Sequence, residues 1–129
     1  MELKCFMYEC IKRCCLSKSE VYSSLYSKAH SGTYVSYIRG NRCQSETDLF
    51  YEISASFQFP WYFGENWPAL DECLCDLDWL SFCGLFVVVD DFSATFEGNK
   101  CMQDQLIEQF LSMIQYWKTI VPIEVWLNN

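Results

Sequence analysis

The chain has 129 residues, 51% of them hydrophobic and 18% aromatic, which indicates one folded domain and excludes a disordered segment. Its formal net charge is −8: residues 1–33 carry five basic and three acidic residues, net +2, whereas residues 34–129 carry four basic and fourteen acidic residues, net −10. An acidic domain repels phosphates and attracts basic proteins, so the charge disfavours direct nucleic-acid binding and favours a basic protein partner.

The first 33 residues are expected to form an N-terminal extension that docks on the rest of the chain. The stretch ELKCFMYECI could form a strand, and SEVYSSLYSKAH fits either a strand or a weak helix. Glu9, Lys12 and Arg13 interrupt the apolar run that a secretory signal would need. No apolar run approaches the roughly 20 residues that cross a bilayer. We therefore expect a cytoplasmic protein with no membrane partner.

The first strand and helix of the main domain have clear local signals. The stretch TYVSYIRG (33–40) is rich in β-branched and aromatic residues and ends at a glycine, which predicts a strand. Ser45 and Asp48 have the spacing of a capping box, and Pro60 ends the helix that follows. The apolar residues recur at helical spacing: Leu49, Phe50, Ile53 and Phe57.

A short second helix is expected to begin at Asn66. Asparagine is a favoured N-cap, and Pro68 falls in the first turn, where a missing N–H group costs nothing. One face of this helix is apolar: Ala69, Leu70, Cys73, Leu74 and Leu77.

The remaining elements complete an alternation of strands and helices. GLFVVVDDF (84–92) reads as a strand covered on both faces, and SATFEGNKC reads as a loop. Residues 103–118 form an amphipathic helical pattern, and VPIEVWL (121–127) is a last strand. This alternation predicts an α/β domain over residues 34–129, with a small, mostly parallel sheet and right-handed crossovers.

The residues that most often carry catalysis or bind metals form no recognisable set. Nine cysteines have irregular spacing without a C-x-x-C pair, which indicates small hydrophobic side chains rather than a redox or metal site. His30 is the single histidine and lies in a polar stretch. Adjacent acidic residues leave open an enzyme that uses Mg²⁺, but no nucleophile or second motif supports it. We expect no enzyme activity, no metal and no cofactor.

The second predicted helix carries an excess of like charge. Glu72 and Asp76 repel at helical i, i+4 spacing by on the order of 0.2–0.5 kcal/mol, and an acid near the helix C-terminus opposes the helix dipole. Aromatic residues flank these charges, and of these we expect Phe63 and Trp79 to be at least partly in the core. The segment is either a solvated face or a surface suited to a cationic partner, since Tyr and Trp beside charge are typical interface anchors.

The stretch FPWYFGENWPALDECLCDL resembles the signature of the barstar family, the small intracellular inhibitors of extracellular ribonucleases. The upstream stretch IRGNRCQSETDLFYEI and the downstream order of strand, long helix and strand match the same family, over about residues 34–129. The resemblance implies a three-stranded parallel sheet packed with three to four helices, preceded here by the extension. The matching positions are Pro60, Tyr62, Phe63, Gly64, Asn66, Ala69, Leu70, Glu72, Cys73 and Leu74.

The resemblance also implies a mechanism, in which the acidic helix and its preceding loop enter the ribonuclease active site in place of the RNA phosphate. Glu72 takes the position of the family's dominant inhibitory aspartate. Pro68 stands where an acid is usual, Asp71 where a tryptophan is usual, and Ser112 near another contacting glutamate. These changes imply a ribonuclease or toxin other than the usual target.

The resemblance leads to the hypothesis of a bacterial immunity protein that neutralises a cognate basic ribonuclease toxin, with an expected 1:1 complex. Such a toxin could be secreted or delivered by contact-dependent growth inhibition. The alternative is a barstar-fold binding module for a partner that is not a nuclease. The expected partner-binding residues are Trp61, Tyr62, Gly64, Asn66, Trp67, Asp71, Glu72, Cys75 and Asp76.

Overall fold

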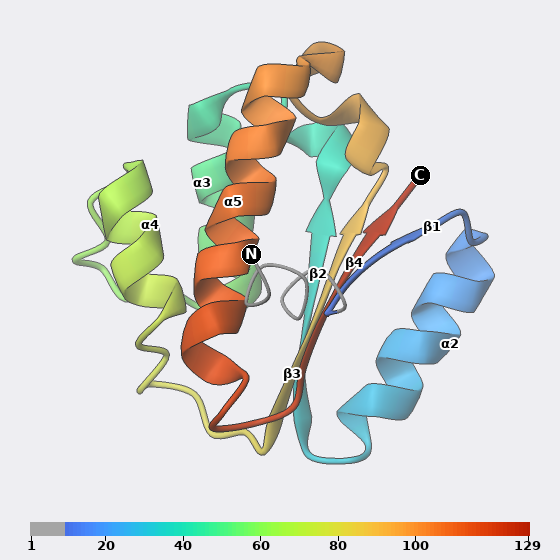
Figure 1. The fold of residues 1–129 in the computed structure, drawn as a ribbon, viewed down its shortest axis with the longest axis vertical. Helices are drawn as coiled ribbons and strands as arrows, with labels where there is room; N and C mark the ends of the chain where they lie inside the picture. The colour runs from blue at the N-terminus through green and yellow to red at the C-terminus, as the bar shows by residue number, and fades with distance from the viewer. Residues whose placement is uncertain (1–9) are drawn as a thin grey trace.

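Four parallel strands form the single sheet of the computed structural model, which describes residues 10–129. The strand order is β1-β4-β3-β2, and each neighbouring pair is parallel (Figure 1). The strands are β1 (Ile11–Cys14), β2 (Thr33–Arg39), β3 (Gly84–Asp90) and β4 (Ile123–Asn128). The expected α/β fold with a parallel sheet is confirmed, but the sheet has four strands rather than three.

The additional strand comes from the N-terminal extension. β1 pairs with β4 in the register Ile11 to Val125, and most of the stretch in which a strand was expected lies outside the described residues. The second stretch of the extension, for which a strand or a helix was possible, is helix α2 (Lys18–Ala29). Its start is a full capping box, in which Ser17 and Glu20 each satisfy the other's backbone N–H.

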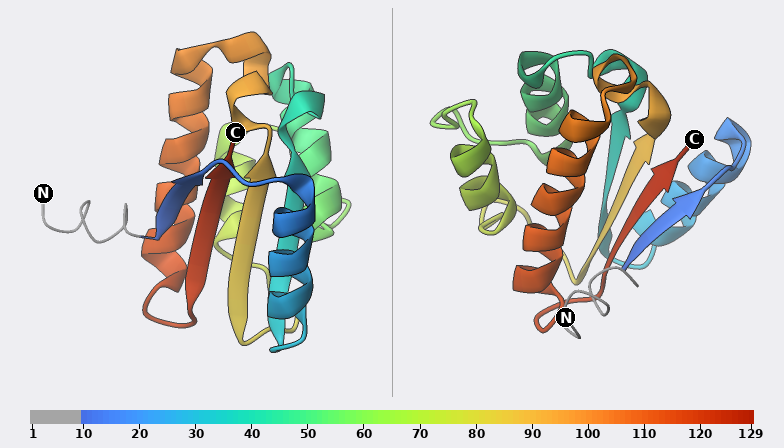
Figure 2. Two further views of the ribbon diagram at one scale, coloured as in Figure 1. Left: turned by 90° about the vertical axis from the view of Figure 1, so that its right-hand side faces the viewer. Right: turned by 45° about the horizontal axis from the view of Figure 1, so that its top comes forward.

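Helices cover both faces of the sheet. Three lie on one face and α2 lies on the other (Figures 1 and 2). The three are α3 (Glu46–Phe57), α4 (Trp67–Leu74) and α5 (Lys100–Trp117). Two short 3₁₀ segments follow β2 and β3: η1 (Gly40–Arg42) and η2 (Phe92–Gly98). The stretch expected to be a loop holds most of η2, in which Thr95, Phe96 and Glu97 depart from helical geometry. Its end, after the cap residue Asn99, contributes the first two residues of α5.

β3 lies at the centre of the core, and all seven of its residues are buried. This confirms the strand covered on both faces. The main core lies between the sheet and helices α3, α4 and α5, and a smaller cluster of Val21, Phe86 and Val88 lies under α2. Because α3 and α5 are anchored on the sheet, they form the platform on which the short helix α4 rests.

Candidate functional site

The loop before α4 is held by its helix cap. Asn66 Oδ1 accepts a hydrogen bond from the Ala69 amide at 2.8 Å, and its Nδ2 donates to the Gly64 carbonyl at 3.2 Å. Pro68 lies within the first turn, as expected. Glu65 has a φ of 53°, which is uncommon for a residue other than glycine. Asn66 thus fixes both the helix start and the turn that precedes it.

The inner face of α4 is apolar and its end is tied to α5. Leu70 and Leu74 are fully buried, and the Trp117 indole donates to the Leu74 carbonyl at 2.7 Å. The helix ends at Leu74, so Asp76 lies just beyond it rather than one helical turn from Glu72 within it. The repulsion that was expected between Glu72 and Asp76 assumed a helix that continues to Asp76, and α4 does not extend that far.

The aromatic residues around α4 separate into exposed and buried groups. Trp61 and Tyr62 have exposed fractions of 95% and 57%, and their rings meet edge to face at 5.9 Å. Phe63 and Trp79 pack against the core, as expected. Trp67 also packs against the core, edge to face on Phe50, and its buried Nε1 has no hydrogen-bond partner among the described residues. Trp67 therefore anchors the start of α4 on the core rather than facing solvent.

Glu72 and Asp76 are exposed and share one shallow depression of about 110 Å³. Its lining consists of Tyr62, Phe63, Gly64, Ala69, Glu72, Cys73 and Asp76. Partial desolvation, followed by the negative charges of Asp78 and Asp76, raises the pKa of the Tyr62 hydroxyl. A neutral phenol ring beside two carboxylates is a surface that attracts a cation.

Asp71 does not face outward with Glu72. It is half-buried, and its Oδ1 accepts hydrogen bonds from Gln109 Nε2 at 2.8 Å and Ser112 Oγ at 2.6 Å on α5. Successive residues of a helix point about 100° apart, so Asp71 and Glu72 cannot share a face. Asp71 and Glu72 were both expected to contact the partner, but in the structure Asp71 bonds to α5 and only Glu72 is exposed.

Cys75 and the other expected contact residues differ in how far they are exposed. Cys75 is half-buried, with its Sγ 3.9 Å from Asp71 Oδ1. Burial, followed by the charge of Asp71, raises the pKa of the Cys75 thiol to about 11, so the thiol is protonated at neutral pH. Of the nine expected contact residues, the structure exposes Trp61, Tyr62, Gly64, Asn66, Glu72 and Asp76, and it places Trp67, Asp71 and Cys75 partly inside.

Gln109 was not expected from the sequence as part of this site. It lies on the buried side of α5, with an exposed fraction of 8%. A polar side chain on the apolar face of an amphipathic helix needs a partner, so the position of Gln109 in the helical pattern signals a buried polar contact without identifying Asp71 as the partner.

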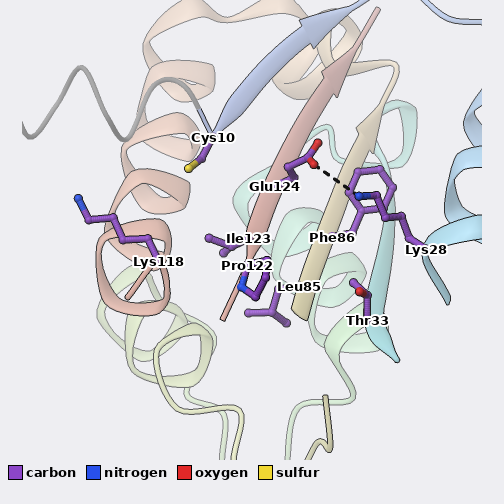
Figure 3. Close-up of a pocket in the computed structure, with 9 residues that line it drawn as sticks. All are labelled: Cys10, Lys28, Thr33, Leu85, Phe86, Lys118, Pro122, Ile123 and Glu124. Carbon is purple, nitrogen blue, oxygen red and sulfur yellow. Dashed lines mark ion pairs between the residues drawn. The ribbon is translucent and has the colours of Figure 1, made fainter. Parts of the chain in front are cut away.

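A different hollow, of about 290 Å³, lies at the amino ends of β2, β3 and β4 (Figure 3). Lys28 Nζ and Glu124 Oε1 form an ion pair across it at 3.6 Å. None of the nine expected contact residues lines it.

Within residues 10–129, no group of three or more His, Cys, Asp or Glu side chains is arranged to hold a metal ion. In the same residues, no helix is both long enough and apolar enough to cross a bilayer. His30 is exposed after α2, with its Nδ1 2.9 Å from the Tyr26 carbonyl. Cys43 and Cys73 are buried, consistent with the small hydrophobic role expected of several cysteines.

The sequence was compared with protein families and with curated proteins. The curated proteins gave no significant match. The sequence model of one family, described as Barstar (barnase inhibitor), matches residues 33–127. The match contains β2, α3, the aromatic loop, α4, β3 and α5, together with most of β4, and it begins after β1 and α2. The chain therefore belongs to the barstar family, a family of ribonuclease inhibitors.

Proposed function

We propose that this protein is a cytoplasmic immunity protein that binds a cognate ribonuclease toxin and blocks its active site. The observation that carries the proposal is the exposed Glu72 of a barstar-family chain. Glu72 projects from a capped helix and lines the depression that it shares with Asp76 and Tyr62. In this role the protein acts by occupying the toxin, and it needs neither a cofactor nor catalytic groups of its own.

The geometry supports phosphate mimicry by the exposed acids. Glu72 and Asp76 bring two carboxylates to one depression, and a carboxylate binds a guanidinium through two parallel hydrogen bonds. Ribonucleases bind phosphate through cationic side chains, so a carboxylate pair competes with RNA for the same groups. Trp61 and Tyr62 supply rigid aromatic area beside the charges, as anchors of protein interfaces do.

The net negative charge of the chain supports a basic partner. The whole chain carries −8. Such a field raises the association rate with a basic protein and falls off with ionic strength.

The first experiment is co-expression with the product of the neighbouring gene. We expect that product to be a small basic domain that is toxic alone, and we expect this chain to restore growth and to co-purify with it. A stable complex with a protein that has no nuclease activity would instead support the alternative, a binding module for another target. The inward position of Asp71 favours this alternative, because it leaves fewer acids on the surface to take the place of RNA phosphate.

The second experiment tests Glu72 itself. Glu72→Ala should weaken binding to a catalytically inactive form of the toxin by about 2 kcal/mol or more, measured by calorimetry, because it removes a central interface charge. The matched control is Glu97→Ala. Glu97 is exposed on η2, which packs on η1, α5 and β4, and its loss should change binding by less than about 0.5 kcal/mol. Equal, small effects of the two substitutions would reject this site.

A further inference from the structure

The contact between Asp71 and α5 is the main polar link along the length of α4. Both hydrogen bonds, from Gln109 and Ser112, end on the same oxygen, Oδ1. A second polar link, from the Trp117 indole to the Leu74 carbonyl, holds the end of the helix. The helix is therefore joined to α5 at two levels, one near its middle and one at its last residue.

These links supply what the apolar contacts of α4 lack. The helix has only eight residues and rests on Leu70, Cys73 and Leu74, and burial of such side chains is not directional. Hydrogen bonds have preferred distances and angles, so the Asp71 contact selects one rotation of α4 about its axis. Because adjacent helical residues diverge by about 100°, this rotation directs Glu72 away from α5 and into the shared depression.

We propose that Asp71 is a positioning residue, which sets the rotation of α4 so that Glu72 is presented to the partner, and that it is not itself a contact acid. This proposal rests on the function proposed above for Glu72. It also accounts for an acid at a half-buried position: Asp71 serves as an acceptor for two donors of α5.

Two variants separate a positioning role from a contact role. Asp71→Asn removes the charge but keeps an oxygen at the Oδ1 position, which can accept both hydrogen bonds. The double variant Gln109→Leu/Ser112→Ala removes both donors but keeps every acidic residue. A contact acid requires the charge, whereas a positioning residue requires the donors.

The first measurement is amide hydrogen exchange in the free protein, which does not depend on any partner. We expect the double variant to speed exchange in α4 by at least about tenfold relative to α3, because local opening of α4 becomes easier. Asp71→Asn should stay within about threefold of the native protein. The amides of α3 report global unfolding, so a general loss of stability is distinguished from a local one. Unchanged exchange of α4 in the double variant would overturn the proposal.

The second measurement is binding to a catalytically inactive form of the toxin that the co-expression experiment identifies. We expect the double variant to weaken binding at least about tenfold and Asp71→Asn to change it by less than about threefold. The reverse pattern would make Asp71 a contact acid and overturn the proposal. If exchange changes as expected but Glu72→Ala leaves binding intact, the proposed function of Glu72 fails while the link between Asp71 and α5 remains.

Discussion

Asp90 shows how a single buried carboxylate joins the N-terminal extension to the rest of the domain. It ends β3 and accepts hydrogen bonds from Tyr37 at 2.6 Å, Asn128 at 2.9 Å and Lys18 at 3.0 Å. Asn128 also bonds to the backbone of Leu16 through both its amide atoms. Burial alone raises the pKa of Asp90, but these hydrogen bonds outweigh it and lower the pKa to about 2.

The lowered pKa predicts an acid-dependent stability at this residue. The ionised form is favoured in the folded protein, so its contribution is present above the ordinary pKa of 3.8 and is lost as pH falls toward 2. Its size is roughly 2 kcal/mol. Asp90→Asn should lower the free energy of unfolding by about 2–4 kcal/mol at pH 6, and urea denaturation should show this difference shrinking between pH 4 and pH 2. A difference that is the same at pH 6 and pH 2 would contradict the assignment.

At the scale of single elements, α4 is the least self-sufficient helix of the site. An eight-residue helix is shorter than the roughly 12–15 residues that isolated helices need, so caps and packing decide whether it forms. Its first turn contains no acidic residue to interact with the helix dipole, which leaves Asn66 as the main stabilising group at that end.

The cap of α4 should therefore be measurable on its own. Asn66→Ala should lower the free energy of unfolding by about 1 kcal/mol in urea denaturation, because the Ala69 amide loses its acceptor. Asn66→Asp is the control, since a carboxylate still accepts that hydrogen bond and adds a favourable charge at the helix start. Equal destabilisation by the two substitutions would show that the side chain acts in some way other than capping.

At the scale of the whole molecule, the extension forms a layer of the fold. Helix α2 covers Phe86 and Val88 on the sheet face opposite α4, and β1 extends the sheet beside β4. A parallel sheet is stable when both faces are covered, so this layer stabilises the platform on which α4 is presented.

Two substitutions on α2 test whether this layer is required. Val21 is fully buried against the sheet, so Val21→Asp should lower the free energy of unfolding by about 3 kcal/mol or more. Ser23→Asp introduces the same charge at an exposed position two residues away, and its effect should stay within about 0.5 kcal/mol. Similar, small values in chemical denaturation would mean that α2 does not stabilise the domain.

The sequence alone determined the elements whose signals are local. The apolar run of β3, the helical spacing in α3 and α5, and the caps at Ser45 and Asn66 all predicted the observed structure, because periodicity and capping involve residues within a few positions of one another. The exposed Glu72 and Tyr62 were also expected, through the family resemblance of the surrounding stretch.

Tertiary structure alone decided the features that depend on distant partners. β1 has four residues, two of them charged, and becomes a strand by pairing with β4, more than a hundred residues away in the chain. Asp71 turns inward because Gln109 and Ser112 offer donors from another helix, whereas its sequence neighbours indicated only a cluster of acids. In both cases the deciding hydrogen bonds join segments that are far apart in the sequence. The residues next to β1 or to Asp71 in the chain therefore do not indicate these bonds.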